Sequence, residues 1–286
     1  MTEKMIPAGD AQLCAEAFGS PDDPAILLIG GAAASMDYWE DEFCSRLAAA
    51  GRFVVRYDFR DTGRSTAYPA GSPGYTGADL MTDALAVLDG YGVAAAHLYG
   101  VSMGGGIAQQ LGVEYPARVL SLTLQSTSPA GPASPDRPDL PPMSPQLAEV
   151  FASEEPGPDW SDRDAAMEAM VDGERLFGGD IPLDEVHVRA TVARMYDRTT
   201  DVAASQTNHW ILVDGELDRA SLAEITAPTL VLHGTTDPLL PYPHAEALAA
   251  EIPGARLVPL EGMGHQYPPR AVWDTVVAEV VAHTAR

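Results

Sequence analysis

Three residues that together could activate a nucleophile lie in three separate loops of the chain. Ser102 lies within Gly100-Val101-Ser102-Met103-Gly104, which matches G-x-S-x-G, a pattern in which a tight strand-to-helix bend lifts a serine hydroxyl clear of a sheet. A serine hydroxyl is a weak nucleophile at neutral pH, so it needs a general base, and that base needs a group that holds its tautomer. Asp237 and His265 each follow a predicted core strand. We therefore predict that His265 is the base and that Asp237 orients it.

The order of these residues supports the prediction. In an open parallel sheet, ligands bind beyond the carboxyl ends of the strands, where the loops carrying Ser102, Asp237 and His265 would lie. The order Ser, Asp, His along the chain is that of the α/β-hydrolase catalytic triad. Each residue also has a non-catalytic interpretation. Ser102 could be a turn serine, Asp237 could be a turn or helix-cap residue before Pro238, and His265 is one of several histidines in the chain. The competing residues are Asp214 and Asp218 for the acid, and His209, His233 and His244 for the base.

An acyl-transfer reaction also needs backbone donors for the oxyanion. The N–H of Met103, at the start of the helix after the serine, is one predicted donor, because the helix dipole favours negative charge there. The second donor is expected in the small-residue loop after the strand 25–29, and we assign it to Ala32.

Strands and helices alternate along the chain, which predicts an α/β fold with a doubly wound, mostly parallel sheet. Continuous apolar runs such as Ala25-Ile26-Leu27-Leu28-Ile29 are typical of strands covered on both faces. The predicted strands are 11–18, 25–29, 53–57, 94–99, 119–124, 227–234 and 255–260. The predicted helices of the sheet-forming part are 37–50, 75–90, 103–115, 242–251 and 269–284. The charged loop 58–65 lacks the Gly-Lys-Ser/Thr ending of a P-loop and is interpreted as a structural loop.

From Ser126 the pattern changes to loops rich in Pro, Ser, Gly and Asp, followed by helices without strands. We predict a helical cap at 126–212, inserted into a hydrolase core formed by 1–125 and 213–286. The predicted cap helices are 145–153, 164–177, 183–198 and 201–212. Methionines 143, 167, 170 and 195 lie in this region, where they either line an apolar pocket or fill the interior of the cap.

Composition limits the other possibilities. The chain has 286 residues, a formal net charge of −24 and one lysine, Lys4, so binding to nucleic acid or to an anionic membrane is not expected. No signal peptide or membrane span is visible, and the two cysteines, Cys14 and Cys44, are too few for a disulfide framework, so we expect a cytoplasmic protein. No metal motif or dinucleotide-binding glycine pattern occurs, so no cofactor is expected. The oligomeric state is left open.

The same residues resemble a known family. Gly30 through Trp39, the block 57–65, the serine motif and Gly262-Met263-Gly264-His265 are similar to the aclacinomycin methylesterases, within the α/β-hydrolases. This resemblance implies hydrolysis of a methyl ester on a polyketide. Two departures occur: many members carry His-Gly where this chain has Gly30-Gly31, which removes a side chain that braces the loop, and the usual Arg-Gly is Arg60-Asp61.

These observations favour a cofactor-independent serine hydrolase of small or medium hydrophobic esters, in which Ser102, Asp237 and His265 form the triad and the N–H groups of Ala32 and Met103 hold the oxyanion. One alternative uses the same triad with peroxide, as the cofactor-free haloperoxidases and perhydrolases of this fold do. Another is a ligand receptor that kept the fold without catalysis. The expected partner is a small-molecule ester.

Overall fold

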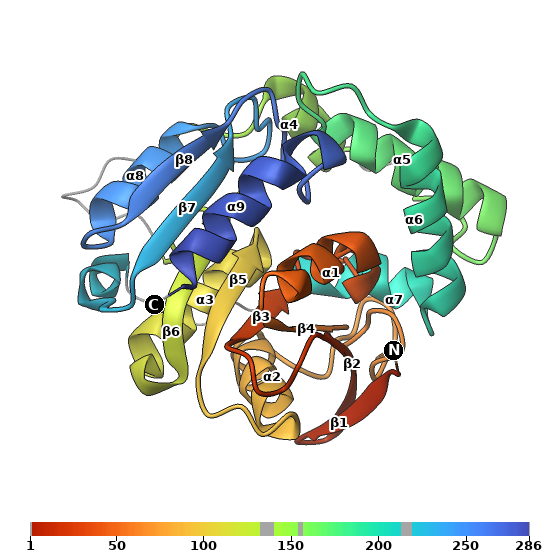
Figure 1. Cartoon of the computed structure of the whole chain (residues 1–286). Coiled ribbons are helices and arrows are strands. Elements are labelled where there is room, and N and C mark those ends of the chain that lie inside the picture. The colour runs from red at the N-terminus through yellow and green to blue at the C-terminus, as the bar shows by residue number, and fades with distance from the viewer. Residues whose placement is uncertain (1, 132–139, 154–156, 213–218, 286) are drawn as a thin grey trace.

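Eight strands form one sheet in the computed structural model, which describes residues 2–131, 140–153, 157–212 and 219–285. The strand order is β1-β2-β4-β3-β5-β6-β7-β8, with β1 and β2 antiparallel to their neighbours and the remaining pairs parallel (Figure 1). The predicted α/β class with a mostly parallel sheet is therefore confirmed. The strands are β1 Lys4–Ala8, β2 Ala11–Phe18, β3 Ala25–Ile29, β4 Phe53–Tyr57, β5 Ala96–Val101, β6 Val119–Gln125, β7 Thr229–Gly234 and β8 Arg256–Leu260.

Strand β1 was not predicted from the sequence. It lies at one edge of the sheet, where β2 is its neighbour, and Pro7 lies opposite Gln12. A proline cannot donate to a strand ladder and is tolerated at such an edge. This short segment forms a strand because it pairs with β2. The residues of the segment by themselves do not indicate that pairing.

Helices cover both faces of the sheet, in two layers. Helices α1 (Asp41–Ala49) and α9 (Trp273–His283) pack on one face, and α2 (Gly77–Gly90), α3 (Met103–Glu114) and α8 (Pro243–Glu251) pack on the other (Figure 1). Each face has its own apolar core, one around Leu27, Leu98 and Leu111 and one around Trp39 and Phe43. Short 3-10 helices connect these elements: η1 Met36–Tyr38, η2 Pro116–Arg118, η3 Asn208–Ile211, η4 Arg219–Glu224 and η5 Arg270–Val272.

The first predicted helix begins later than expected. The interval 37–50 contains η1 and then α1, because Ser35 caps a separate short turn by accepting a hydrogen bond from the N–H of Asp37. The last predicted helix, 269–284, is divided in a similar way into η5 and α9. Apolar spacing alone does not reveal these local caps.

Among the described residues, four α-helices lie between β6 and β7: α4 (Pro145–Phe151), α5 (Arg163–Phe177), α6 (Glu185–Arg198) and α7 (Val202–Thr207). We call the described part of 140–212 the inserted segment. Its helices gather at one end of the molecule (Figure 1), and α5 and α6 share a small core of Met170, Val171, Val192 and Met195. The predicted division into a core and a cap at 126–212 remains a prediction.

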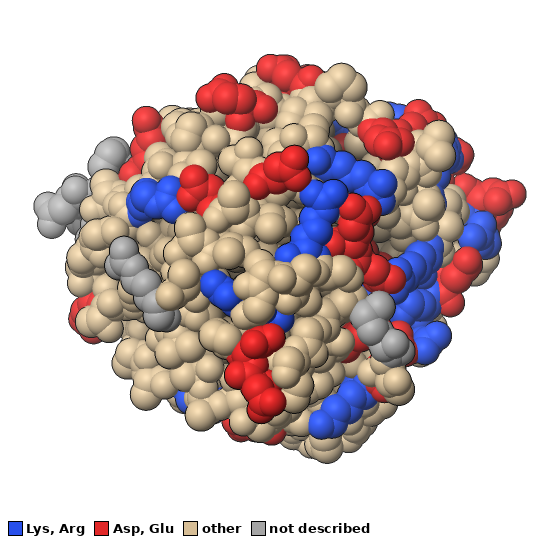
Figure 2. Space-filling view, in the orientation of Figure 1, with Lys and Arg blue, Asp and Glu red and all other residues tan. Residues whose placement is uncertain are grey.

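Arginines and carboxylates lie side by side on the surface (Figure 2). Arg46 contacts Glu42 and Asp274, for example, and Arg189 contacts Glu168 and Glu185. Much of the positive charge is thus paired with carboxylates. Among the described helices, none is long and apolar enough to cross a membrane.

Candidate active site

Ser102 lies at a sharp bend between β5 and α3. Its backbone has φ +53° and ψ −117°, a conformation that non-glycine residues rarely adopt and that stores strain. The bend requires glycine on both sides: a Cβ on Gly100 would lie 2.2 Å from the carbonyl oxygen of Gly104, and a Cβ on Gly104 would lie 2.3 Å from that of Gly30. The G-x-S-x-G pattern therefore forms the tight bend that the sequence predicts.

The structure brings Ser102, His265 and Asp237 together in one hydrogen-bonded chain. His265 Nε2 lies 3.0 Å from Ser102 Oγ, and His265 Nδ1 lies 2.9 Å from Asp237 Oδ2. These three residues come from the loops after β5, β7 and β8. Ser102 is more than a hundred residues away in the sequence from Asp237 and His265. The geometry permits His265 to accept the serine proton while Asp237 holds its other nitrogen protonated.

Asp237 is held as a buried carboxylate. Its side chain is fully buried, and its Oδ1 accepts hydrogen bonds from the N–H groups of Leu239 (2.9 Å) and Leu240 (2.8 Å). Burial raises the pKa of Asp237, but the hydrogen bond and charge of His265, the charge of His233 and the backbone donors outweigh it, so the pKa lies below its usual range. The carboxylate is thereby kept ionised, as an orienting group requires.

The competing histidines lie in other environments. His233 is buried in β7, where its Nε2 lies 2.8 Å from the Leu240 carbonyl oxygen and 3.4 Å from Asp237. His244, in α8, contacts Ser128 and the Pro141 carbonyl. His209 lies in η3, near the end of the inserted segment, and is buried. The competing acids Asp214 and Asp218 lie outside the described residues.

The cysteines do not form a competing nucleophile. Cys14 and Cys44 are both buried and unbridged, and burial raises the pKa of each thiol to about 12. A thiol with such a pKa remains protonated at neutral pH, so neither cysteine is available as a thiolate nucleophile. The described residues contain no cluster of three or more His, Cys, Asp or Glu side chains arranged to hold a metal ion.

The predicted oxyanion donors lie on either side of Ser102. Met103 is the first residue of α3, and Ala32 lies in the loop after β3, which we call the oxyanion loop (residues 30–35). A Cβ on Gly31 would lie 3.6 Å from Ser102 Cβ, so this loop passes directly beside the serine. Ala32 and Ser102 also line the same cavity, which agrees with the predicted position of this donor.

Ser102 lies in the walls of two cavities. One has a volume of about 180 Å³ and is lined by Trp160, Met170 and Phe177 of the inserted segment together with His265. The other, of about 530 Å³, extends along α3 and includes Ile107. An ester bound at Ser102 would therefore have both cavities next to it.

Two pocket residues were not found from the sequence. Glu174 of α5 and Tyr267, two residues after His265, line both the 180 Å³ cavity and a neighbouring cavity of about 280 Å³. Burial raises the pKa of Glu174, with a hydrogen bond to Tyr38 and the charge of His265 opposing it. No motif marks Glu174, because a carboxylate on a predicted helix usually faces solvent. Met170 both packs within the inserted segment and lines the cavity.

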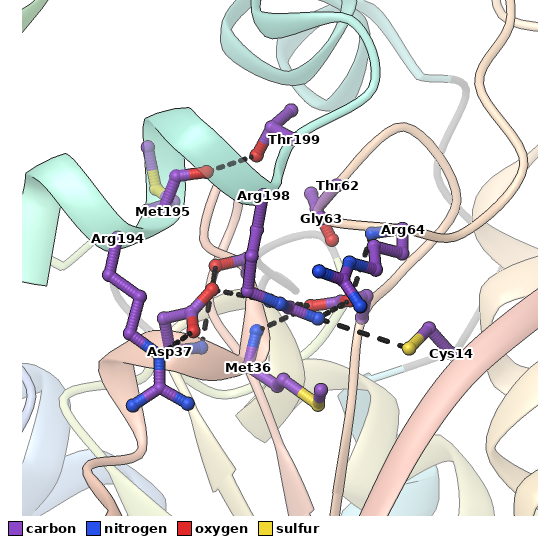
Figure 3. Close-up of polar contacts among 12 residues, drawn as sticks. Cys14, Met36, Asp37, Thr62, Gly63, Arg64, Arg194, Met195, Arg198 and Thr199 are labelled. Carbon is purple, nitrogen blue, oxygen red and sulfur yellow. Dashed lines mark hydrogen bonds and ion pairs between the residues drawn. The ribbon is translucent and has the colours of Figure 1, made fainter. Parts of the chain in front are cut away.

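A buried ionic cluster joins the inserted segment to the loops beside the site (Figure 3). Arg198, at the end of α6, pairs with Asp37 in η1 and lies 2.7 Å from Asp58 Oδ2. Asp58 in turn accepts hydrogen bonds from the N–H groups of Met36 (2.8 Å) and Arg64 (3.0 Å). The prediction that the loop 58–65 is a structural loop held by side-chain hydrogen bonds is confirmed.

The fold and the hydrogen-bonded Ser, His and Asp define the class. Residues 24–266 match the family model described as the alpha/beta hydrolase fold, so the chain belongs to this family, as predicted. An esterase from Exiguobacterium antarcticum superposes on the whole chain with a TM-score of 0.78 and 22% identity, which supports the fold.

Curated relatives are more similar in sequence. The chain is 38% identical to a rhodomycin D methylesterase of Streptomyces sp. (strain C5), over 99% of this chain and 98% of that protein. It is 37% identical to a rhodomycin D methylesterase of Streptomyces peucetius, with the same coverage. The predicted resemblance to methylesterases of the α/β-hydrolase family is therefore confirmed.

Proposed function

We propose that this protein is a serine carboxylic-ester hydrolase that cleaves a methyl ester on a polyketide through an acyl-enzyme. The hydrogen-bonded chain from Ser102 through His265 to Asp237 is the observation that carries the proposal. The two rhodomycin D methylesterases, which match this chain almost from end to end, support the ester and its methyl group. The peroxide-dependent and receptor alternatives are not favoured by these relatives.

The reaction follows from the positions of these groups. Ser102 Oγ attacks the ester carbonyl carbon while its proton passes to His265 Nε2. The N–H groups of Ala32 and Met103 bind the resulting oxyanion. The tetrahedral intermediate collapses when the C–O bond to the alcohol breaks and His265 donates the proton to that oxygen. Methanol leaves, and the acyl group stays on Ser102.

Deacylation reverses these roles. His265 removes a proton from water, whose oxygen attacks the acyl carbon, and the same backbone donors bind the second oxyanion. When this intermediate collapses, the bond to Ser102 Oγ breaks and His265 returns the proton to the serine. The products are a carboxylic acid and the free enzyme, and no cofactor takes part in these steps.

We further propose that the inserted segment acts as a cap that forms one wall of the substrate pocket. Trp160, Met170 and Phe177 supply apolar surface opposite Ser102, which suits a hydrophobic acyl group. We also propose a cytoplasmic location and a small-molecule ester as the partner. Binding to nucleic acid or to anionic membranes is not expected, because the net charge of −24 repels their phosphate groups.

The test compares the parent with Ser102→Ala. Methanol release from a polyketide methyl ester and hydrolysis of a short p-nitrophenyl ester are both measured, and we expect the variant to lose both activities. Ser45→Ala serves as a matched control, because it makes the same substitution at an exposed position of α1 that lines neither cavity. Equal rates for the parent and Ser102→Ala would overturn the proposal. A much faster peroxide-dependent bromination would favour the perhydrolase instead.

A further inference from the structure

Ala33 in the oxyanion loop has a backbone conformation that needs external support. Its φ is +62°, in the left-handed region, which costs a residue with a Cβ about 1 kcal/mol or more. Glycine usually occupies such positions, but this chain has alanine. The surrounding contacts must therefore hold the loop at this residue, which directly follows Ala32.

The inserted segment supplies these contacts. The Ala33 N–H donates to His209 Nδ1 at 2.9 Å, and the Ala33 carbonyl accepts hydrogen bonds from Ser205 Oγ at 3.2 Å and Gln206 Nε2 at 3.3 Å. Both backbone polar groups of this residue are thus bound by side chains of α7 and η3. These partners are more than 170 residues away in the sequence.

His209 is itself fixed on its second nitrogen. Its Nε2 lies 2.9 Å from the Arg60 carbonyl oxygen, so Nε2 carries the hydrogen and Nδ1 is free to accept from Ala33. His209 is 6% exposed, and its ring packs edge-on against Phe59 and Tyr75. Burial lowers the pKa of His209, which keeps the ring neutral in the tautomer that both hydrogen bonds require.

The residue before Ala32 is held from a different direction. The Gly31 N–H donates to the Tyr267 hydroxyl at 2.7 Å, and a Cβ on Gly30 would lie 3.0 Å from this hydroxyl. Tyr267 therefore lies beside Gly30. Ala32 lies between two amides, those of Gly31 and Ala33, that are each bound by a side chain from elsewhere in the fold.

From these contacts we propose that His209 is a positioning residue: it holds the oxyanion loop so that the Ala32 N–H points at the oxyanion formed on Ser102. The inserted segment thus supports the loop at Ala33, and Tyr267 supports it at Gly31, on the other side of Ala32. This inference rests on the proposed esterase function. His209 also lines the larger of the two cavities next to Ser102, but it makes no hydrogen bond to Ser102, Asp237 or His265, so we assign its effect on the reaction to the loop.

The decisive variant is His209→Phe, because it keeps a ring between Phe59 and Tyr75 and removes both hydrogen bonds. Loss of one oxyanion donor lowers kcat by about 10²-fold to 10³-fold in other serine hydrolases, and we expect a loss approaching this range. KM for a short p-nitrophenyl ester should stay within about threefold of the parent, because phenylalanine keeps a ring of similar shape in the wall of the 530 Å³ cavity. His209→Gln, which offers one acceptor and one donor, should recover part of the loss.

A second measurement separates a positioning role from packing. A trifluoromethyl ketone forms a bond between its carbonyl carbon and Ser102 Oγ and places an oxyanion near the Ala32 N–H, whereas the matching secondary alcohol cannot. We expect His209→Phe to weaken binding of the ketone in parallel with kcat/KM and to leave binding of the alcohol unchanged. The control is His97→Gln, which alters a buried histidine of β5 bonded to Ser121 Oγ and should leave both affinities and kcat unchanged.

The inference is overturned if folded His209→Phe retains kcat within about threefold of the parent, or if kcat falls while the affinity for the ketone does not. If His209→Phe does not fold, His209→Leu, which is also apolar and is smaller, removes the same two hydrogen bonds and carries the test. A parallel, several-fold decrease in kcat and in affinity for the ketone then supports the inference, and parent values overturn it. Failure of the parent to form the ketone adduct would instead refute the proposed function.

Discussion

Removal of the Arg198 side chain should destabilise the protein far more than removal of an exposed arginine. Arg198 is 9% exposed and pairs with two fully buried carboxylates, Asp37 and Asp58. Arg194 also contacts Asp37, at 2.8 Å, but the described residues provide Asp58 with no other ion pair. Arg198→Met therefore leaves at least one buried carboxylate without a cation.

The expected size of the effect follows from this arrangement. Breaking a buried ion pair by removing one partner costs about 3–5 kcal/mol, against a typical unfolding free energy of about 5–15 kcal/mol. Arg163→Met is the matched control, since Arg163 pairs with Asp197 on the surface with side-chain exposures of 47% and 58%. Loss of such an exposed pair costs far less, because water solvates and screens both groups. Both variants should therefore fold, with clearly different stabilities.

The effect of Arg198→Met should also depend on pH. Burial raises the pKa of Asp58 even though Arg198 and two backbone donors oppose the shift. A carboxyl whose folded-state pKa is raised contributes stability that is present below its unfolded pKa and is lost as the pH rises through the folded pKa. Without Arg198 the folded pKa rises further, so the difference in stability between parent and variant should be larger near pH 8 than near pH 5.

Urea unfolding followed by tryptophan fluorescence at both pH values measures these free energies. The double variant Arg198→Met/Asp58→Asn should recover part of the loss near neutral pH, because the amide removes the unpaired charge. The reasoning is refuted if Arg198→Met and Arg163→Met lose equal stability near pH 8, or if the loss caused by Arg198→Met grows as the pH falls.

Three further outcomes are expected. Asp237→Asn should lower kcat by about 10⁴-fold with little change in fold, because the imidazole loses its correct tautomer, and a decrease below about tenfold in ester hydrolysis assays would contradict this role. Gly104→Ala should prevent stable folding, because its Cβ would lie 2.3 Å from the Gly30 carbonyl oxygen, whereas Gly106→Ala should be neutral or stabilising; thermal unfolding compares the two. Glu174→Gln should stabilise the protein more as the pH rises, because burial raises the pKa of Glu174 and its ionised form opposes folding. Denaturation near pH 5 and pH 8 measures this gain in stability, and a smaller gain at the higher pH would refute the reasoning.

The positions of the proposed catalytic residues were predictable because each depends on local sequence. Ser102 needs a strand, a glycine-flanked bend and a helix, and all three are visible in a stretch of a dozen residues. Asp237 and His265 directly follow apolar strands, and parallel strands end at the same edge of a sheet. Local patterns together with one rule of topology were therefore sufficient to bring these side chains together.

Other features depend on contacts between distant segments, which local patterns do not record. Strand β1 exists because β2 pairs with it, and Glu174 faces a cavity because α5 packs over His265. The role that we propose for His209 depends on Ala33 and Arg60, which meet this side chain only when the inserted segment folds onto the oxyanion loop. The sequence by itself thus determined the reactive groups and the fold that carries them. Only the tertiary structure decided what surrounds and supports them, because burial, pKa and hydrogen-bond partners depend on which distant segments pack together.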